Sequence, residues 1–125
     1  METYRDFVVR QKSKDVAVLV YKITKEFPAK EKNGLTSQMR RAATSISSNI
    51  AEGRLRNSSK EFKRFSLIAF SSGGELETQI KISKEVLNLT ENTFLEAEKL
   101  LTEIMKMFNT MIGNRSASVS NSLAT

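Results

Sequence analysis

The sequence predicts an all-α protein, an antiparallel up-down-up-down four-helix bundle, and three observations support this fold class. Apolar residues recur at steps of three and four along four successive stretches, which is the spacing of amphipathic helices. The 125 residues include only five glycines and one proline, so few positions interrupt a helix. The sequence also lacks the regularly spaced turn residues that a sheet protein needs. Amphipathic helices joined by short connections bury their apolar faces by packing as a bundle.

The first helix is expected to run from about Tyr4 or Asp6 to Phe27. Pro28 should end it, because the residue before a proline is driven out of the helical region. Residues 29–34, AKEKNG, then form a charged loop that closes with Asn-Gly, a common turn pair.

The second helix is expected to start near Thr36 or Ser37 and to stop at Gly53, since glycine commonly ends helices. Residues 39–53, MRRAATSISSNIAEG, combine a narrow apolar stripe with many small polar side chains. Serine, threonine and asparagine form helices poorly because their side chains compete for backbone hydrogen bonds. Tertiary contacts must therefore hold this helix in place.

The third helix is expected to begin after Ser58, because Ser58 and Glu61 have the spacing of a capping box. Apolar and small residues then follow nearly a heptad repeat as far as Leu87. Gly73 and Gly74 interrupt the middle of this pattern, and each costs roughly 1 kcal/mol of helix stability relative to alanine. We expect either a close helix crossing or a local kink at this point.

The fourth helix is expected to begin near Thr90 and to carry the most regular apolar stripe, from Phe94 to Met111. The residues that follow, GNRSASVSNSLAT, include too few large apolar groups to fold alone. We therefore expect one folded domain, residues 1–112, and a flexible serine-rich tail, residues 113–125.

The composition argues against an enzyme. Histidine and cysteine are both absent, which excludes most metal sites, acid-base dyads and nucleophile-base pairs. We therefore expect a non-enzymatic protein with no cofactor and no metal ion. The sequence shows no apolar run long enough to span a membrane and no secretory leader, so we expect a cytoplasmic protein with no membrane partner.

Polar residues follow one face of the second helix and continue on the third. They could form a binding surface or an internal hydrogen-bond network that joins the two helices. We interpret them as a structural network, in which an Arg41 to glutamate ion pair inside the bundle would set the helix register. The residues of this network are Arg41, Ser45, Asn49, Glu52 and Glu75.

A cluster of basic residues at the junction of the second and third helices is the best candidate for function. The net charge is +6, and residues 1–57 hold 12 lysines and arginines against 6 acidic residues. The five cations of the cluster are opposed locally only by Glu61, so phosphate backbones would be attracted to them. The alternative is an ordinary solvated helix end, and no base-reading motif accompanies the cluster. The candidate nucleic-acid-binding residues are Arg54, Arg56, Lys60, Lys63 and Arg64.

Four motifs together resemble a known bacterial family. An FP pair at residues 27–28 precedes L-x-x-Q-x-R-R-A-A-x-S-I-x-x-N-I-A-E-G at residues 35–53. S-x-K-E-F at residues 58–62 and S-x-x-E-L at residues 72–76 follow. With these spacings the chain resembles the four-helix-bundle proteins called 23S rRNA intervening sequence proteins, over about residues 5–112. Gly73-Gly74 replaces better helix formers expected beside S-x-x-E-L, and the tail inherits nothing from the resemblance.

The resemblance carries expectations about function. Members of this family are similar in fold to the accessory variability determinant proteins of diversity-generating retroelements, which form pentameric barrels with basic surfaces and assist a reverse transcriptase. The resemblance therefore implies a small non-enzymatic protein, a homopentamer, whose partner is RNA or another nucleic acid. Our leading hypothesis is an oligomer that contacts mainly phosphates. The alternative is a protein-interaction scaffold or accessory subunit, for example for a reverse transcriptase.

Overall fold

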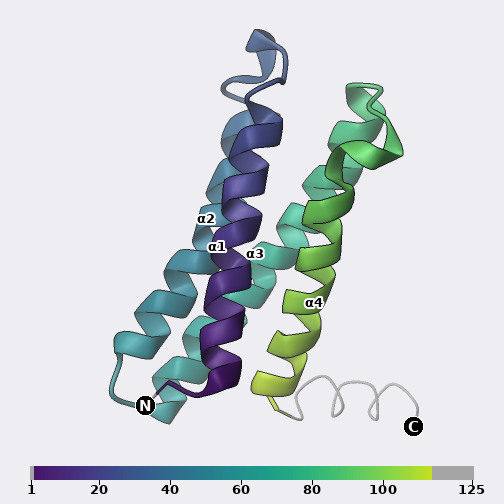
Figure 1. Cartoon of the computed structure of the whole chain (residues 1–125). Coiled ribbons are helices and arrows are strands. Elements are labelled where there is room, and N and C mark those ends of the chain that lie inside the picture. The colour runs from purple at the N-terminus through teal and green to yellow at the C-terminus, as the bar shows by residue number, and fades with distance from the viewer. Residues whose placement is uncertain (1, 114–125) are drawn as a thin grey trace, which may run out of the picture.

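Residues 2–113, the part of the chain that the computed structural model describes, form four α-helices and two short 3-10 helices. Figure 1 shows the α-helices side by side with the chain reversing at each connection, so the predicted up-down-up-down bundle is confirmed. Of the expected tail, residues 114–125 lie outside the described residues. In chain order the elements are α1 (Tyr4–Thr24), η1 (Ala29–Glu31), α2 (Leu35–Leu55), α3 (Ser59–Val86), η2 (Glu91–Phe94) and α4 (Leu95–Met111).

Each α-helix packs against two neighbours: α2 lies against α1 and α3, and α4 lies against α3 and α1. The buried apolar residues come from all four helices, as amphipathic stripes require. Two edge-to-face aromatic pairs add to this core: Phe27 with Phe94, at 6.2 Å between ring centroids, and Phe70 with Phe108, at 6.4 Å. Each such pair contributes roughly 0.5–1.5 kcal/mol beyond the area it buries. The first pair joins the α1–α2 connection to the start of α4, and the second pair joins α3 to α4.

α1 ends at Thr24, earlier than the predicted end at Phe27. After Thr24 the chain tightens into hydrogen bonds between residues three apart, from Glu26 N–H to Ile23 O at 3.1 Å and from Phe27 N–H to Thr24 O at 3.0 Å. Pro28 then continues in an extended conformation. The helical turns therefore end just before Pro28, as predicted, but the last turn has the three-residue hydrogen bonds of a 3-10 helix and is not α-helical.

α2 continues through Gly53 to Leu55, so the prediction that Gly53 stops the helix is wrong. A Cβ atom at Gly53 would lie only 2.9 Å from Phe65 Cβ and 3.5 Å from Phe62 O. Both of these atoms belong to the first turns of α3 and are held by its backbone. Gly53 therefore allows the close approach of α2 and α3.

α3 begins after Ser58 as predicted, and Ser58 Oγ accepts a hydrogen bond from Glu61 N–H at 3.2 Å. Only this half of the predicted capping box forms, because the Glu61 carboxylate accepts hydrogen bonds from Arg64. α4 starts later than predicted, since the turn from Glu91 is a 3-10 helix and the α-helix begins at Leu95. These differences move helix ends and leave the order of the elements as predicted.

The two adjacent glycines of α3 have different surroundings. A Cβ atom at Gly73 would overlap Met105 Sδ on α4, so the missing side chain lets α3 and α4 pack closely. A Cβ atom at Gly74 would meet no atom within 4 Å. α3 runs through both positions as one helix, so a close crossing accounts for Gly73. Nothing in the structure explains Gly74.

We predict that these glycines respond differently to alanine. Gly74→Ala should raise the free energy of unfolding by about 1 kcal/mol, because alanine favours the helix and its methyl group meets open space. Gly73→Ala should be at least about 1 kcal/mol less stable than Gly74→Ala, because Met105 has to leave a packed position. Urea denaturation of both variants measures the difference, and equal stabilities would contradict a close α3–α4 contact at Gly73.

Candidate nucleic-acid interface

The connection between α2 and α3 is short and gathers the predicted cations at one end of the bundle. Arg56 follows the last residue of α2 and Ser58 caps the start of α3, so the chain reverses within a few residues. The close approach at Gly53 keeps the last turn of α2 against the first turns of α3. All five predicted nucleic-acid-binding residues are exposed at this turn: Arg54, Arg56, Lys60, Lys63 and Arg64.

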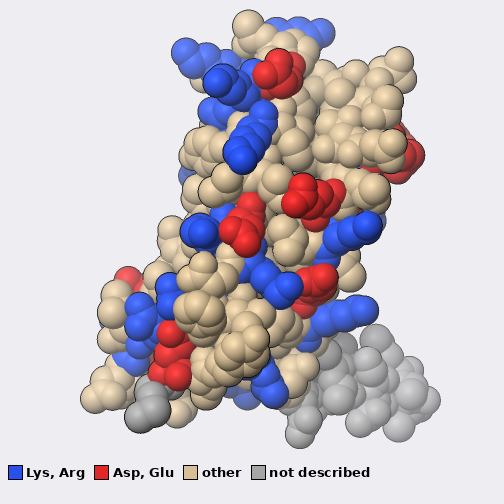
Figure 2. Space-filling view, in the orientation of Figure 1, with Lys and Arg blue, Asp and Glu red and all other residues tan. Residues whose placement is uncertain are grey.

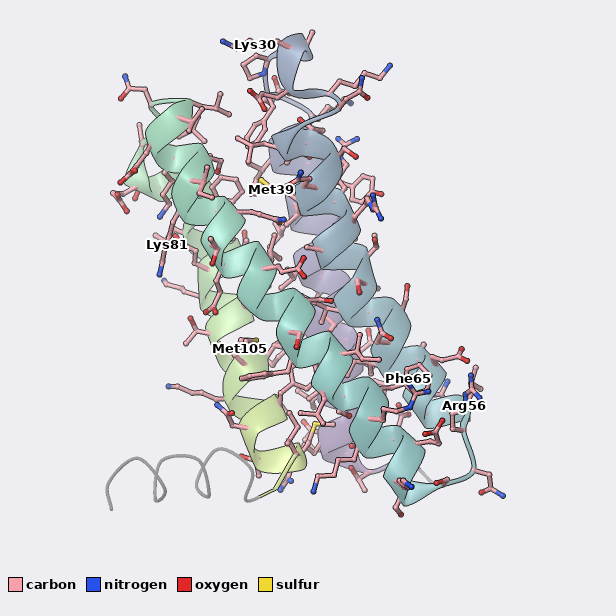
Figure 3. The ribbon with its side chains drawn as sticks, turned by 180° about the vertical axis from the view of Figure 1, so that it is seen from behind. Lys30, Met39, Arg56, Phe65, Lys81 and Met105 are labelled. Carbon is pink, nitrogen blue, oxygen red and sulfur yellow. The ribbon has the colours of Figure 1, made fainter. Side chains whose placement is uncertain are left out.

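Phe65 organises two of these cations, and Figure 3 shows Phe65 and Arg56 together at the α2–α3 turn. The centroid of its ring lies 5.1 Å from Arg56 Cζ and 4.4 Å from Arg64 Cζ. Attraction between a guanidinium and an aromatic face holds each arginine near the ring. Phe65 itself is buried, so one fixed aromatic side chain anchors a cation from each side of the turn.

Two arginines of the cluster pair with carboxylates close by in the sequence. Arg56 Nη2 lies 2.7 Å from Glu52 Oε1, and Arg64 donates to both carboxylate oxygens of Glu61 at 2.9 and 3.1 Å. Spacings of four and three residues favour such pairs on a helix. The spacing of Glu52 and Arg56 was therefore a usable signal in the sequence, although the prediction placed Glu52 in the internal network.

A third arginine pairs with the start of the chain. The Glu2 carboxylate lies 3.7 Å from Arg54 Nε and 2.8 Å from Arg10 Nε. No local spacing could have predicted the contact between Glu2 and Arg54, because the fold alone brings them together. The expectation that only Glu61 opposes the cations of the cluster is therefore wrong, because Glu2 and Glu52 also pair with its arginines. The two lysines of the cluster, Lys60 and Lys63, take part in no ion pair within residues 2–113.

The arginines hold two of these carboxylates in the charged form. The hydrogen bond from Arg64 lowers the pKa of Glu61, and the hydrogen bond from Arg10 lowers the pKa of Glu2. Both carboxylates are ionised at neutral pH and offset part of the positive charge. When Arg10 is counted with the cluster, six cations face the three carboxylates of Glu2, Glu52 and Glu61, which leaves a net charge of +3.

A shallow pocket of about 420 Å³ opens beside the cluster, between the start of α1 and the α2–α3 turn. The turn contributes guanidinium, amide and hydroxyl groups, and the start of α1 contributes carboxylates. The side chains that line it include Glu2, Asp6, Arg54, Arg56, Asn57 and Ser58. Such a lining can bind a polar group by hydrogen bonds.

The described part of the chain has neither a metal site nor a membrane-spanning helix. In residues 2–113, no cluster of three or more acidic side chains is placed to hold a metal ion. No helix in the same residues has the length and apolar character needed to cross a membrane. The chemistry of the candidate surface comes from its cations and its hydrogen-bond donors.

The polar stripe predicted between α2 and α3 is partly internal. Ser45 Oγ lies 2.8 Å from Ser72 Oγ, and this hydrogen bond joins the two helices. Asn49 Nδ2 donates to Ser45 O at 2.8 Å and to Ser45 Oγ at 3.0 Å. Ser72 is thus the α3 member of the network. It was absent from the predicted set, although it begins the S-x-x-E-L motif.

The charged members of that set lie at the surface. Arg41 and Glu75 are exposed and line a second shallow pocket on the α2–α3 face, and neither takes part in an ion pair within residues 2–113. Glu52 lies beside Arg56, as described above. The expected ion pair inside the bundle is therefore corrected to exposed charges. Water solvates these groups, whereas burial would desolvate them at a cost that an ion pair often fails to repay.

A comparison with models of protein families finds a match along nearly the whole bundle. The model of the 23S rRNA-intervening sequence protein family matches residues 5–110. The chain belongs to this family. The resemblance predicted from the four motifs is confirmed, and the match covers all four α-helices almost completely.

A solved structure supports the same fold for this family member. It is a crystal structure from Bacteroides thetaiotaomicron VPI-5482, described as a protein with unknown function from the S23 ribosomal protein family. The two chains are 27% identical with a TM-score of 0.79, and the alignment covers 86% of this chain and 97% of the other. Among curated proteins, none matches this chain.

We predict that Glu61 titrates below the usual range of a glutamate and that Arg64→Gln returns its pKa toward that range. Glu2 should keep its lowered pKa in this variant, because Arg10 is the main cause there. Because the pKa of Glu61 is lower in the folded protein than in the unfolded chain, the Arg64–Glu61 pair stabilises the fold at pH values above the pKa of the unfolded chain. This stabilisation is lost as the pH falls through the pKa of Glu61 in the folded protein. NMR titration of the carboxyl carbons tests this, and an unchanged Glu61 curve would refute the assigned cause.

Proposed function

We propose that this family member is a non-enzymatic oligomeric protein that binds RNA, or RNA in complex with protein, mainly through phosphate groups. The observation that carries the proposal is the α2–α3 turn, where five exposed cations gather at one end of the bundle. Lys60 and Lys63 take part in no ion pair within residues 2–113, so their charge is available to an external anion.

One protomer alone offers a modest electrostatic contact. A net charge of +3 at this surface supports about three phosphate contacts, which for a single strand gives a slope of log K against log salt near −2. Cyclic assembly would repeat the surface once per subunit and strengthen the attraction. For this reason we propose that the binding form is an oligomer, a homopentamer as the family resemblance implies.

The residues of the same surface favour a binding function over catalysis. A hydrolytic or transfer reaction needs a nucleophile and a base in contact with each other. The sequence holds no histidine or cysteine for these roles. The hydrogen-bonded carboxylates Glu2 and Glu61 have lowered pKa values, which makes them weak bases at neutral pH. These observations support a non-enzymatic function.

A second candidate function is an interaction scaffold or accessory subunit, for example for a reverse transcriptase. The observation that favours it is the exposed side of α3, where Glu75 lies on the same side as two aliphatic residues further along the helix. Ile82 is 44% exposed and Val86 is 62% exposed. Exposed aliphatic groups on one helix face are a feature of protein contact surfaces. RNA binding, measured as below, separates the two functions.

We predict that the full-length protein binds single-stranded RNA at low salt and loses affinity as the salt concentration rises. Neutralising both free lysines, by Lys60→Gln with Lys63→Gln, should reduce the salt slope by about 1.4, or about 0.7 for each phosphate that a lysine no longer neutralises. Fluorescence anisotropy with labelled RNA measures both effects. Lys81→Gln with Lys99→Gln is the control, because it removes the same charge elsewhere. Binding that is absent at low salt or indifferent to salt would reject the proposal.

We also predict that freeing the arginines of the turn strengthens RNA binding. Glu52→Gln with Glu61→Gln removes the carboxylates that hold Arg56 and Arg64. Both guanidinium groups then become available to phosphates, so the salt slope should steepen by about 1.4. The measurement is the same anisotropy titration.

The control for this variant removes two carboxylates away from the turn, Glu77→Gln with Glu85→Gln. Both residues lie in the second half of α3, and neither takes part in an ion pair within residues 2–113. Equal strengthening by the two double variants would mean that overall charge, and not the α2–α3 surface, governs binding.

A further inference from the structure

The end of the bundle where α1 leads into α2 carries more unpaired positive charge than the α2–α3 turn. Residues 22–41 contain six cations and two carboxylates, a net charge of +4. None of these six cations takes part in an ion pair within residues 2–113, whereas three of the five cations at the α2–α3 turn do. Figure 2 shows lysines and arginines gathered at this end. The six are Lys22, Lys25, Lys30, Lys32, Arg40 and Arg41.

The two carboxylates of this stretch leave the cations free. Glu31 Oε1 accepts a hydrogen bond from Leu35 N–H at 3.1 Å. This carboxylate therefore binds a backbone N–H at the start of α2 and not a lysine. Glu26 takes part in no ion pair within residues 2–113. The lysines are all exposed, and their ammonium groups can therefore meet an external anion: Lys22, Lys25, Lys30 and Lys32.

Arg40 joins this basic surface to an aromatic side chain. Its guanidinium carbon lies 4.5 Å from the centroid of the Tyr21 ring. Arg40 Nε donates to Thr24 Oγ1 at 2.9 Å, and Arg40 Nη2 donates to Tyr21 O at 3.2 Å. Both acceptors are neutral, so Arg40 keeps its full positive charge beside the tyrosine.

A groove of about 400 Å³ runs between α1 and α2 from this point. Its surface is mainly apolar, and its edges carry hydroxyl and ammonium groups. Val18 and Tyr21 remain 44% and 45% exposed in it, although both are large apolar side chains. The residues that line it include Lys14, Val18, Tyr21, Lys22, Thr44 and Ser48.

We propose that this groove binds a single-stranded nucleic-acid segment, with a base stacked on the face of the Tyr21 ring that Arg40 does not cover and the backbone phosphates against the unpaired lysines. The proposal rests on the proposed function and adds a second contact surface to it. An aromatic platform beside a basic groove is the arrangement by which proteins bind single strands without reading their sequence. Because Tyr21 lies 17 residues beyond Tyr4 at the start of α1, the stacking platform is roughly 25 Å along the bundle from the α2–α3 turn. One subunit could therefore hold two segments of RNA.

The charge of the surroundings favours a nucleic acid as the occupant of the groove. A helix from another protein could cover Val18 and Tyr21, but only an acidic one would match the four exposed lysines of residues 22–41. A single strand provides a phosphate at every nucleotide together with a flat apolar base, and so matches both the lysines and the tyrosine.

The test uses the full-length protein and labelled oligouridine, whose binding is followed by fluorescence anisotropy at several salt concentrations. Tyr21→Ala should weaken binding roughly tenfold, the effect of losing one stacked base, whereas Tyr21→Phe should keep the affinity because the ring remains. Lys22→Gln with Lys25→Gln should reduce the salt slope by about 1.4. Val86→Ala is the control, because it truncates an exposed apolar side chain on α3 and should change neither quantity.

The outcomes separate this inference from the proposed function. Salt-dependent binding that Tyr21→Ala and the lysine variant leave unchanged would overturn the groove and leave the α2–α3 surface standing. Failure of the unaltered protein to bind oligouridine or RNA at low salt would overturn both. If Tyr21→Ala changes the mass measured by light scattering but not the affinity, a second copy occupies the groove and the inference is wrong. The lysine variant alters only exposed side chains, so its result holds even where Tyr21→Ala lowers stability.

Discussion

The close contact between α2 and α3 at Gly53 is the constraint on which the candidate surface depends. Without a side chain at Gly53, Phe65 can approach α2, and its ring then lies within reach of arginines from both sides of the turn. The Ser45–Ser72 hydrogen bond joins the same two helices further along. Residues that are mediocre helix formers are therefore tolerated in α2, because tertiary contacts and not propensity hold the helix. The grouping of cations at the turn is a result of helix packing.

The positive charges at the two ends of the bundle differ in how far they are paired with carboxylates. At the α2–α3 turn all three arginines of the cluster are paired with carboxylates, which fixes side chains but reduces the net attraction for phosphates. At the α1–α2 end the cations of residues 22–41 stand without such partners within residues 2–113. Membership of the 23S rRNA-intervening sequence protein family establishes the fold, but a fold does not by itself specify a function. The distribution of paired and free cations is thus the main guide to where the proposed anionic partner would bind.

Much of the fold could be predicted from the sequence, because helical spacing, proline and the Ser58 cap are local signals. The role of Gly53 could not, since a helix end and a close helix contact both favour glycine and only the position of Phe65 distinguishes them. The same limit applies to the polar stripe. Spacing shows that Arg41 and Ser45 lie on the same face of α2, but not how much of that face α3 covers. The contact of Glu2 with Arg54 links distant parts of the chain, and the sequence holds no signal for it.

The contacts of Arg40 with the last turn of α1 affect how strongly its charge can act. A lysine that binds a phosphate loses much of its rotational freedom, and this loss opposes binding by about 0.5–1.5 kcal/mol for each side chain that becomes immobile. Arg40 has already lost that freedom on folding, because Thr24, the Tyr21 carbonyl oxygen and the Tyr21 ring fix its guanidinium. The entropy is lost when the bundle forms and not when a ligand arrives. Among the cations at this end, Arg40 would therefore lose the least side-chain entropy on binding an anionic ligand.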